Sequence, residues 1–335
     1  MSGLANYPFL SLPDAEVSRE AGTLRVRLRL SPNEHPHLRD HFVEGKTVLV
    51  AAALVELLSE AAACLVEEHH GAPKALVALD ELQLERFLSC TPDGSISLVV
   101  EAKLEPSEWP EETRVRVAIL ADLVRGNGSI KKDCRHASAL ARFRDHPIEA
   151  PLAPTWPALR EVRVAPTDFY AGLMSSRGPL FQGFAATFFL SADRNVLCGS
   201  IVPPADAEFV GGVRGPWLTN PVAHDVALQA QAFLEKLVNP GVHVPLALPA
   251  INFYATGDVE SERYEVLVRR KSGTAMNSVA TVQIVDARGR IVAVYEDSKL
   301  VRRRLLEPTE LREQSQVLRR AGVNWPEPSG VSLTL

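Results

Sequence analysis

A histidine and an aspartate stand in settings suited to acid–base chemistry, one in each half of the sequence. His41 precedes Gly45 and the start of a long apolar segment. A histidine in this place can face a cavity at a helix N-terminus, where free backbone N–H groups and the helix dipole favour a developing oxyanion. Removal of a proton next to a thioester carbonyl requires such a base beside an oxyanion site. The other interpretation is a structural histidine that caps or hydrogen-bonds within the fold.

Asp225 lies in an otherwise apolar segment, four residues before Gln229. Residues at positions i and i+4 of a helix share a face, so the Gln229 amide can hydrogen-bond the carboxyl and orient it. Burial among apolar residues disfavours the charged form of a carboxyl, which suits a general acid at neutral pH. Alternatively, Asp225 lies on an exposed stripe or joins an N-terminal cap.

Two predicted helices must position these residues. The stretch 48–71 is rich in Ala and Leu, almost free of helix breakers and closed by a glycine, which predicts a long helix whose first half is buried. A second helix is predicted from Pro221 to Val238, because an Asn-Pro-Gly turn follows it.

Strand-like segments accompany each predicted helix. Residues 23–30 alternate apolar and basic side chains, which predicts a half-exposed strand. Further strands are predicted at 75–86, 94–105, 113–123, 137–144, 183–192, 196–203, 248–255, 263–271, 276–286 and 289–303. The predicted fold class is therefore α+β, with each half a long helix clasped by an antiparallel sheet.

The order of elements repeats across a proline-rich segment, which we interpret as a linker. We predict an N-terminal unit at 1–146, a linker at 147–160 and a C-terminal unit at 161–305. Residues 306–335 are polar and rich in proline, so they are expected to form a tail that is packed on the surface or partly loose. The halves show no visible sequence repeat, so the duplication is interpreted as structural.

Composition narrows the class of protein. Of the 335 residues, 46% are hydrophobic and 23% charged, and the formal net charge is −5. Acidic and basic residues are interspersed, so no basic face for nucleic acid is expected. Four widely separated cysteines favour a reducing compartment over zinc knuckles or a disulfide framework. The longest apolar run, Val48 to Val55, is too short to cross a bilayer, so we expect a cytoplasmic protein with no membrane contact.

The two candidate residues and their contexts resemble the dehydratase domains of polyketide and polyunsaturated fatty acid synthases. His41 and Gly45 match that family's HxxxGxxxxP motif, with Val50 at the proline position. Asp225 and Gln229 match its DxxxQ motif.

A third motif lies between these two. Gly178-Pro179-Leu180-Phe181 resembles the end of the family's GYxYGPxF motif, and Ser175 and Arg177 stand where that motif has tyrosines. The family's second tyrosine is associated with the catalytic site. Arg177 is therefore expected to alter how the leaving hydroxyl is held, or to place a cation near Asp225, which would then tend to stay ionised.

The resemblance implies a double hotdog fold, in which two fused units each wrap an antiparallel sheet around a central helix. It implies a hydro-lyase that dehydrates a 3-hydroxyacyl thioester on an acyl carrier protein to the 2-enoyl thioester. His41 would be the base and Asp225 the acid, with Gln229 orienting the acid and N–H groups near Gly45 and the helix start holding the oxyanion. No metal or organic cofactor is implied, and the substrate is carried on the phosphopantetheine of the carrier protein.

The resemblance also implies an apolar tunnel for the acyl chain. The residues expected to line it flank the motifs: Leu49, Val50, Gly178, Pro179, Leu180 and Phe181. Each of them alone can equally be a core residue. Exposed edge strands favour a homodimer, since pairing covers them, and other polyketide synthase domains are candidate partners of a chain that is either free-standing or part of a megasynthase.

Three alternatives stay open. His35, His37, Asp40 and His41 lie close together, but their spacing does not fit a hydrolase zinc site and no downstream residues complete a ligand sphere. The same His–Asp pair on this fold can serve a cyclase of the product-template type or a double-bond isomerase. A non-catalytic hotdog module for dimerisation or acyl binding is the third, although a carboxyl within an apolar helix has no evident use there.

Overall fold

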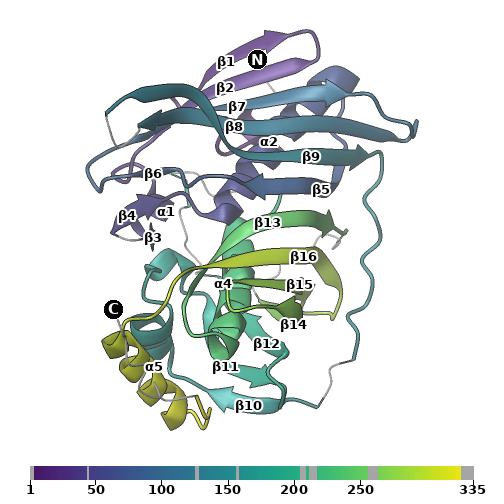
Figure 1. Ribbon diagram of the computed structural model, residues 1–335. Coiled ribbons are helices and arrows are strands. Elements are labelled where there is room, and N and C mark those ends of the chain that lie inside the picture. The colour runs from purple at the N-terminus through teal and green to yellow at the C-terminus, as the bar shows by residue number, and fades with distance from the viewer. Residues whose placement is uncertain are drawn as a thin grey trace.

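One antiparallel sheet runs through both halves of the chain in the computed structural model (Figure 1). The structure describes residues 4–43, 45–124, 128–155, 158–203, 209–210, 217–255 and 263–325. Within these ranges the strands of the sheet are β1 (Glu16–Glu20), β2 (Thr23–Leu30), β5 (Ala75–Leu84), β7 (Ile96–Glu105), β8 (Glu112–Val124), β9 (Ile130–Arg144), β10 (Arg160–Arg163), β11 (Phe184–Leu190), β12 (Val196–Ile201), β13 (Val242–Phe253), β14 (Tyr264–Gly273), β15 (Asn277–Asp286) and β16 (Ile291–Arg304).

The two halves of the sheet meet edge to edge. The strand order is β1-β2-β7-β8-β9-β5 in the first half and β13-β16-β15-β14-β12-β11-β10 in the second. Strands β5 and β13 join the halves, pairing antiparallel with Leu79 opposite Ile251. The inner edges therefore cover each other, and β1 and β10 are the outer edges of the sheet.

The predicted strands are confirmed, although two of them start earlier than their sequence pattern indicates. Strand β9 begins at Ile130 in a polar, largely exposed stretch that shows no alternation of apolar residues. Strand β13 begins at Val242 and contains Pro245, which lies at a register shift in its pairing with β16. A proline inside a strand usually marks an edge or a bulge, so the sequence pattern alone does not reveal this start.

One long helix in each half packs against the sheet. These helices, α2 (Ala51–His70) and α4 (Pro221–Val238), also contact each other, and both predicted helices are confirmed. The side chain of Asn220 caps α4 by accepting a hydrogen bond from the Ala223 N–H at 3.1 Å. Gly71 ends α2 in the left-handed conformation, with φ of +72°. None of the described helices is long and apolar enough to cross a membrane.

Helix α2 is buried well beyond its first half, from Ala52 to Val66, and two of its buried residues are glutamates. Glu60 accepts hydrogen bonds from the backbone N–H groups of the segment before β1, including that of Phe9 at 2.9 Å. Glu56 accepts one at 2.8 Å from the N–H of Thr219, just before α4. Burial raises the pKa of both glutamates. These bonds tie the N-terminal segment and the start of α4 to the first helix.

Shorter elements complete the fold. They are η1 (Leu4–Asn6), α1 (Pro36–Arg39), the small sheet of β3 (Phe42–Val43), β4 (Lys46–Val48) and β6 (Ser89–Cys90), then α3 (Pro166–Asp168), η2 (Phe169–Leu173), η3 (Pro179–Phe181) and the C-terminal helix α5 (Pro308–Arg320). His41 lies directly before β3, and Arg177 and Gly178 lie between η2 and η3.

The predicted linker runs alongside the second half of the sheet (Figure 1). The Ala255 N–H donates to the Ile148 carbonyl at 2.8 Å, and the Ala153 N–H donates to the Gly289 carbonyl at 2.8 Å. Residues 156–157 of the linker lie outside the described residues. Backbone hydrogen bonds thus hold the described part of the linker against the second half.

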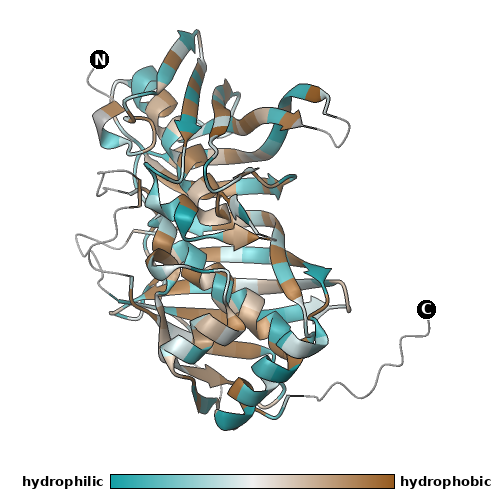
Figure 2. Ribbon diagram, turned by 90° about the vertical axis from the view of Figure 1, so that its left-hand side faces the viewer, coloured by the Kyte–Doolittle hydropathy of each residue, from teal (hydrophilic) through white to brown (hydrophobic). Residues whose placement is uncertain are grey.

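Residues after 305 were expected to form a tail that is packed on the surface or partly loose, and their described part contains a helix, α5, that the sequence pattern did not predict. Its N-terminus has a capping box formed by Glu307 and Glu310. Most of the helix is hydrophilic (Figure 2), yet Leu318 and, beyond the helix, Trp325 are fully buried. The few apolar residues form a narrow stripe on the helix, which the high average polarity of residues 306–335 does not reveal. Residues 326–335 of the predicted tail lie outside the described residues.

Candidate active site

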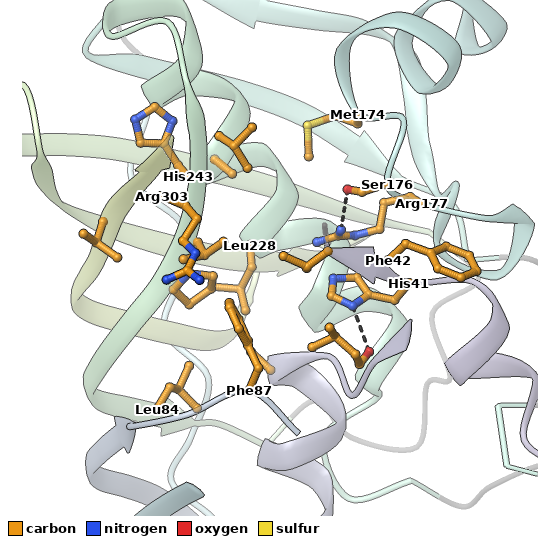
Figure 3. A pocket seen from close by; sticks show the side chains of 18 of the residues that line it. His41, Phe42, Leu84, Phe87, Met174, Ser176, Arg177, Leu228, His243 and Arg303 are labelled. Atoms are coloured by element: carbon orange, nitrogen blue, oxygen red, sulfur yellow. Dashed lines mark hydrogen bonds between the residues drawn. The ribbon is translucent and has the colours of Figure 1, made fainter. Parts of the chain in front are cut away.

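A cavity of about 580 Å³ lies between the two halves, beside α2 and α4 (Figure 3). Both His41, from the first half, and Asp225, from the second, line it. Most of the other lining residues are apolar, and they include Leu49, Leu84, Phe87, Leu173, Met174 and Leu228. A mainly apolar cavity with a few convergent polar groups is typical of a small-molecule site.

His41 is held in one orientation by a hydrogen bond to Val48, seven residues later in the chain. Its Nδ1 lies 2.9 Å from the Val48 carbonyl oxygen, and Figure 3 shows this bond beside the cavity. A carbonyl only accepts, so the ring donates from Nδ1 and its Nε2 keeps a lone pair that can take a proton. Burial, and next the positive charge of Arg177, hold the pKa of His41 well below 6.5. The imidazole is therefore neutral at neutral pH, as a general base must be.

Asp225 is buried on α4, and two hydrogen-bond donors share one of its carboxyl oxygens. The Gln229 Nε2 donates to Asp225 Oδ2 at 2.7 Å, which confirms the predicted i, i+4 contact. The same amide nitrogen donates to the Phe181 carbonyl at 2.9 Å and is thereby fixed itself. Arg177 Nε also donates to Oδ2, at 3.2 Å. Within the described residues Oδ1 has no hydrogen bond, so it is the oxygen free for a substrate.

Arg177 lies between the histidine and the aspartate. Its backbone pairs with that of His41 in an isolated bridge, and its side chain forms the ion pair with Asp225. A further bond, from Nη1 to Ser176 Oγ at 2.9 Å, fixes the guanidinium (Figure 3). Of the two effects expected of Arg177, the structure thus shows the cation beside Asp225.

The Gly178–Phe181 segment is anchored by Asp40, for which the sequence suggested no role beyond the rejected metal site. The Gly178 N–H donates to the Asp40 carbonyl at 2.7 Å, and the Leu180 N–H donates to Asp40 Oδ2 at 2.7 Å. A Cβ at Gly178 would lie 2.4 Å from Asp40 Oδ1, so only glycine fits this close approach. Asp40 therefore positions the loop that carries Arg177.

The predicted tunnel residues take two kinds of position. Leu49 lines the cavity, as does Ser175, whereas Val50 is the N-cap residue of α2 and does not line it. Gly178, Pro179, Leu180 and Phe181 pack behind the lining, with the Phe181 ring edge-on to His41 at 6.4 Å between centroids. Apart from Leu49, the apolar wall comes from many separate elements, and no local motif marks those residues.

Gly45 lies in the turn between β3 and β4, with φ of +75°, and it is not among the lining residues. The backbone nearest the cavity is instead the start of α2, where Ala51 lines it and no side chain caps the helix. The first N–H groups of an uncapped helix are unpaired. Of the two places expected for the oxyanion donors, the helix start therefore borders the cavity, whereas Gly45 does not line it.

The other histidines of the 35–41 cluster contact the fold. His37 Nδ1 lies 2.5 Å from the Phe209 carbonyl oxygen, and its ring stacks on that of Phe209. Burial lowers the pKa of His37 to about 3. In the described ranges no three His, Cys, Asp or Glu side chains are grouped so that they could hold a metal ion.

One set of cavity residues was not predicted. Lys236 and, from other elements, His243, Glu310 and Gln314 also line the cavity. Lys236 follows Asp225 by eleven residues, three helical turns later on the same face. That spacing, with a lysine in an apolar helix, is the signal by which it could have been found.

Family models match both halves of the chain. The model described as "Polyketide synthase dehydratase domain" matches residues 12–121. The model described as "Polyketide synthase dehydratase N-terminal domain" matches residues 148–305. Together the two matches cover most of the chain.

Curated relatives are much longer proteins. The chain is 27% identical over 227 residues to a polyunsaturated fatty acid synthase protein of Thraustochytrium sp., which covers 68% of this chain and 7% of that protein. It is 28% identical over 304 residues to the polyketide synthase GfsA of Streptomyces halstedii, which covers 88% of this chain and 4% of that protein. The chain thus spans less than a tenth of the length of either relative.

Solved structures confirm the fold. The dehydratase domain from the CurF module of curacin polyketide synthase superposes with a TM-score of 0.65 at 12% identity, over 88% of this chain and 99% of that one. The dehydratase domain of PpsC from Mycobacterium tuberculosis, solved in complex with C12:1-CoA, has a TM-score of 0.61 at 22% identity, over the same shares of the two chains. The predicted double hotdog fold is therefore correct.

Proposed function

The chain belongs to the polyketide synthase dehydratase family, and from this premise we propose that His41 and Asp225 remove water from a 3-hydroxyacyl thioester. The chain has the activity of this family: it is a hydro-lyase that acts on hydroxyacyl intermediates of polyketide synthesis. The assignment of residues rests on one observation: the two side chains, one from each half, line the same cavity, and Arg177 lies between them.

The first step is removal of the C2 proton. The neutral His41 ring offers Nε2, because Nδ1 is engaged by the Val48 carbonyl. As the proton leaves, charge develops on the thioester oxygen, and the unpaired N–H groups at the start of α2 next to Ala51 stabilise it. A catalytic base of this kind typically contributes a rate factor of about 10² to 10⁴.

The second step is departure of the C3 hydroxyl as water. A proton on Asp225 Oδ1 passes to the hydroxyl, the C3–O bond breaks and the C2–C3 double bond forms. Arg177 and Gln229 hold Oδ2 and stabilise the carboxylate that remains. The proton held by His41 then returns to Asp225 through solvent, which restores the starting state.

The Arg177–Asp225 ion pair favours a variant of this mechanism. A carboxylate that stays paired with a guanidinium is an acceptor for the C3 hydroxyl rather than its acid. In this variant the His41 imidazolium returns its own proton to the leaving hydroxyl, while Asp225 and Arg177 hold that hydroxyl in place.

We further infer the setting of the reaction. A substrate on the phosphopantetheine of an acyl carrier protein suits a cavity that lies between two halves of the fold, and other polyketide synthase domains would be neighbours of this one. Base, acid and oxyanion donors suffice for the elimination, so no metal or organic cofactor enters our proposal. The outer edge strands β1 and β10 suit homodimer pairing, and four free cysteines suit the cytoplasm.

The test is the product formed from a synthetic 3-hydroxyacyl carrier-protein thioester. We expect wild type to release the mass of one water, and His41→Ala and Asp225→Ala to lose this activity. Exposed residues of the same types supply the controls His69→Ala and Asp93→Ala, which should match wild type. An unchanged mass with a new absorbance would indicate an isomerase, and an inert wild type would indicate a non-catalytic module; either outcome overturns the proposal.

A further inference from the structure

The cavity continues along α4, well past the catalytic residues. Asp225, Leu228, Ala232 and Lys236 all line it, and their spacing of three, four and four residues places them on one face of the helix. Eleven residues of helix advance about 16 Å. Figure 3 shows Leu228 between the Arg177 side of the cavity and the side of His243 and Arg303. An acyl chain that follows this face therefore reaches Lys236.

Lys236 is a buried cation with unused donors. Its side chain is 8% exposed, and within the described residues its only hydrogen bond is to the Leu173 carbonyl. An ammonium has three N–H donors, so two are left. Burial lowers the pKa of Lys236 to about 8, while the negative charge of Glu310 acts in the opposite direction. At neutral pH Lys236 is thus mainly a cation, it lines the cavity, and two of its donors are left for a ligand.

Two neutral polar side chains accompany this lysine. Gln314, on α5, is 6% exposed, and its Oε1 has no hydrogen-bond partner among the described residues. The Nδ1 of His243, on β13, is buried and has no hydrogen-bond partner among the described residues. Burial lowers the pKa of His243 to about 4, and the Gly241 backbone acts in the opposite direction. The charge of Lys236 acts on His243, and the charge of Glu310 acts on Lys236. Gln314 lies one helical turn after Glu310 on α5 and therefore shares its face. The three side chains therefore line the same cavity from three different elements, and the charge effects indicate that they lie near one another.

The neighbouring charges limit what this end can bind. Arg304 and Glu310 form a two-bond ion pair at 2.6 and 2.8 Å and largely neutralise each other. Buried donors and acceptors without partners cost free energy, and an apolar chain end would leave them unpaired. A carboxylate could accept from Lys236 but has no hydrogen to donate to Gln314 Oε1. A hydroxyl can do both, because it donates and accepts.

We propose that Lys236, His243 and Gln314 form a distal site that binds a hydroxyl group on the acyl chain, remote from the thioester. The hydroxyl accepts from the Lys236 ammonium and donates to Gln314 Oε1 or His243 Nδ1. An extended chain needs roughly a dozen carbon–carbon bonds to cover the distance along α4. This inference rests on the proposed function, because that function places the thioester at His41 and the acyl chain along α4. The substrate class that it names is acyl chains that carry a hydroxyl group, as opposed to purely alkyl chains.

Binding of unreactive analogues tests the distal site without requiring turnover. The probes are pantetheine amides of saturated acyl chains of matched length, ending in a methyl, a hydroxyl or a carboxylate, and calorimetry measures their affinities. We expect wild type to bind the hydroxyl probe roughly tenfold more tightly than the methyl probe. Lys236→Met and Gln314→Leu should each remove most of this preference, while the exposed controls Lys299→Met and Gln316→Leu keep it.

Two outcomes would overturn the proposal: equal affinities for the hydroxyl and methyl probes in wild type, or the carboxylate probe binding most tightly. Since Lys236→Met and Gln314→Leu lie on separate helices, a folding defect in one leaves the other as a test. Failure of the proposed function is measured separately, with a 3-hydroxyacyl thioester too short to reach Lys236. If the proposed function is wrong, the wild-type protein does not dehydrate this short substrate.

Discussion

The Arg177 guanidinium Nε lies 3.2 Å from Asp225 Oδ2, so a fixed cation stands beside the carboxyl in the cavity that His41 also lines. The charge acts on both catalytic candidates. It holds the carboxyl through Oδ2, and it helps to keep the imidazole neutral. Arg177 replaces a tyrosine of the family motif. The residue next to the acid–base pair is therefore a charged guanidinium in this chain, where the motif has a neutral phenol.

Replacing Arg177 with Met should move the acid limb of the kcat/KM profile to higher pH. The base must be neutral, and its pKa lies well below 6.5 because of burial first and Arg177 second, with a smaller contribution from His37. Wild-type activity should therefore persist as the pH falls through 6.5. Without the guanidinium the pKa of His41 rises, and activity should decline at a higher pH.

The pH profile of kcat/KM measures this effect, with the exposed α5 residue changed in Arg312→Met as the control. An acid limb at the same pH in Arg177→Met and wild type would show that the charge does not act on the base.

His41→Gln should lower kcat by about 10² to 10⁴ with little change in affinity for an unreactive thioester. Glutamine fills similar space but supplies no group that takes a proton at neutral pH. Single-turnover kinetics combined with calorimetry separates the two quantities. A parallel loss of affinity and rate would instead assign His41 a structural role.

Gly178→Ala should destabilise the protein by about 1–3 kcal/mol, because the new Cβ overlaps Asp40 and the overpacked loop must move. Displacing this loop also displaces Arg177, so activity should fall as well. Thermal unfolding gives the change in Tm. Gly172→Ala is the matched control, since its Cβ would meet only Val317 Cγ2 at 3.4 Å; equal Tm values for the two variants would contradict the anchoring role of Asp40.

Leu318→Ala should cost about 2–5 kcal/mol of unfolding free energy, because Leu318 is fully buried where α5 packs on the second half. Chemical denaturation measures this loss, with the exposed Gln316→Ala as the control on the same helix. A value within error of wild type would restore the interpretation of residues after 305 as a loose tail.

Sequence patterns revealed those features that depend on local spacing. Helix α4 follows the prediction at both ends, because Pro221 can start a helix and an Asn-Pro-Gly turn must end one. The Asp225–Gln229 contact follows from i, i+4 geometry within that helix. Strand β2 likewise follows from strict alternation of apolar and basic residues.

Contacts between distant segments were beyond the reach of such patterns. Glu56 and Glu60 lie in an apolar helix because backbone N–H groups from two other segments need acceptors there. Asp40 holds a loop far along the chain, and Gln314 reaches the cavity from a helix that average polarity hides. Each of these contacts depends on which distant segments the folded sheet brings together. The spacing of residues within one segment does not contain this information.

The most direct measurement of the central claim is a crystal structure with an unreactive 3-hydroxyacyl pantetheine amide. We predict C2 of the acyl chain within reach of His41 Nε2 and the C3 hydroxyl within about 2.6–3.2 Å of Asp225, with the chain directed along α4. An analogue bound elsewhere, or with C2 and the hydroxyl turned away from either side chain, would contradict the claim that these two residues act on one substrate.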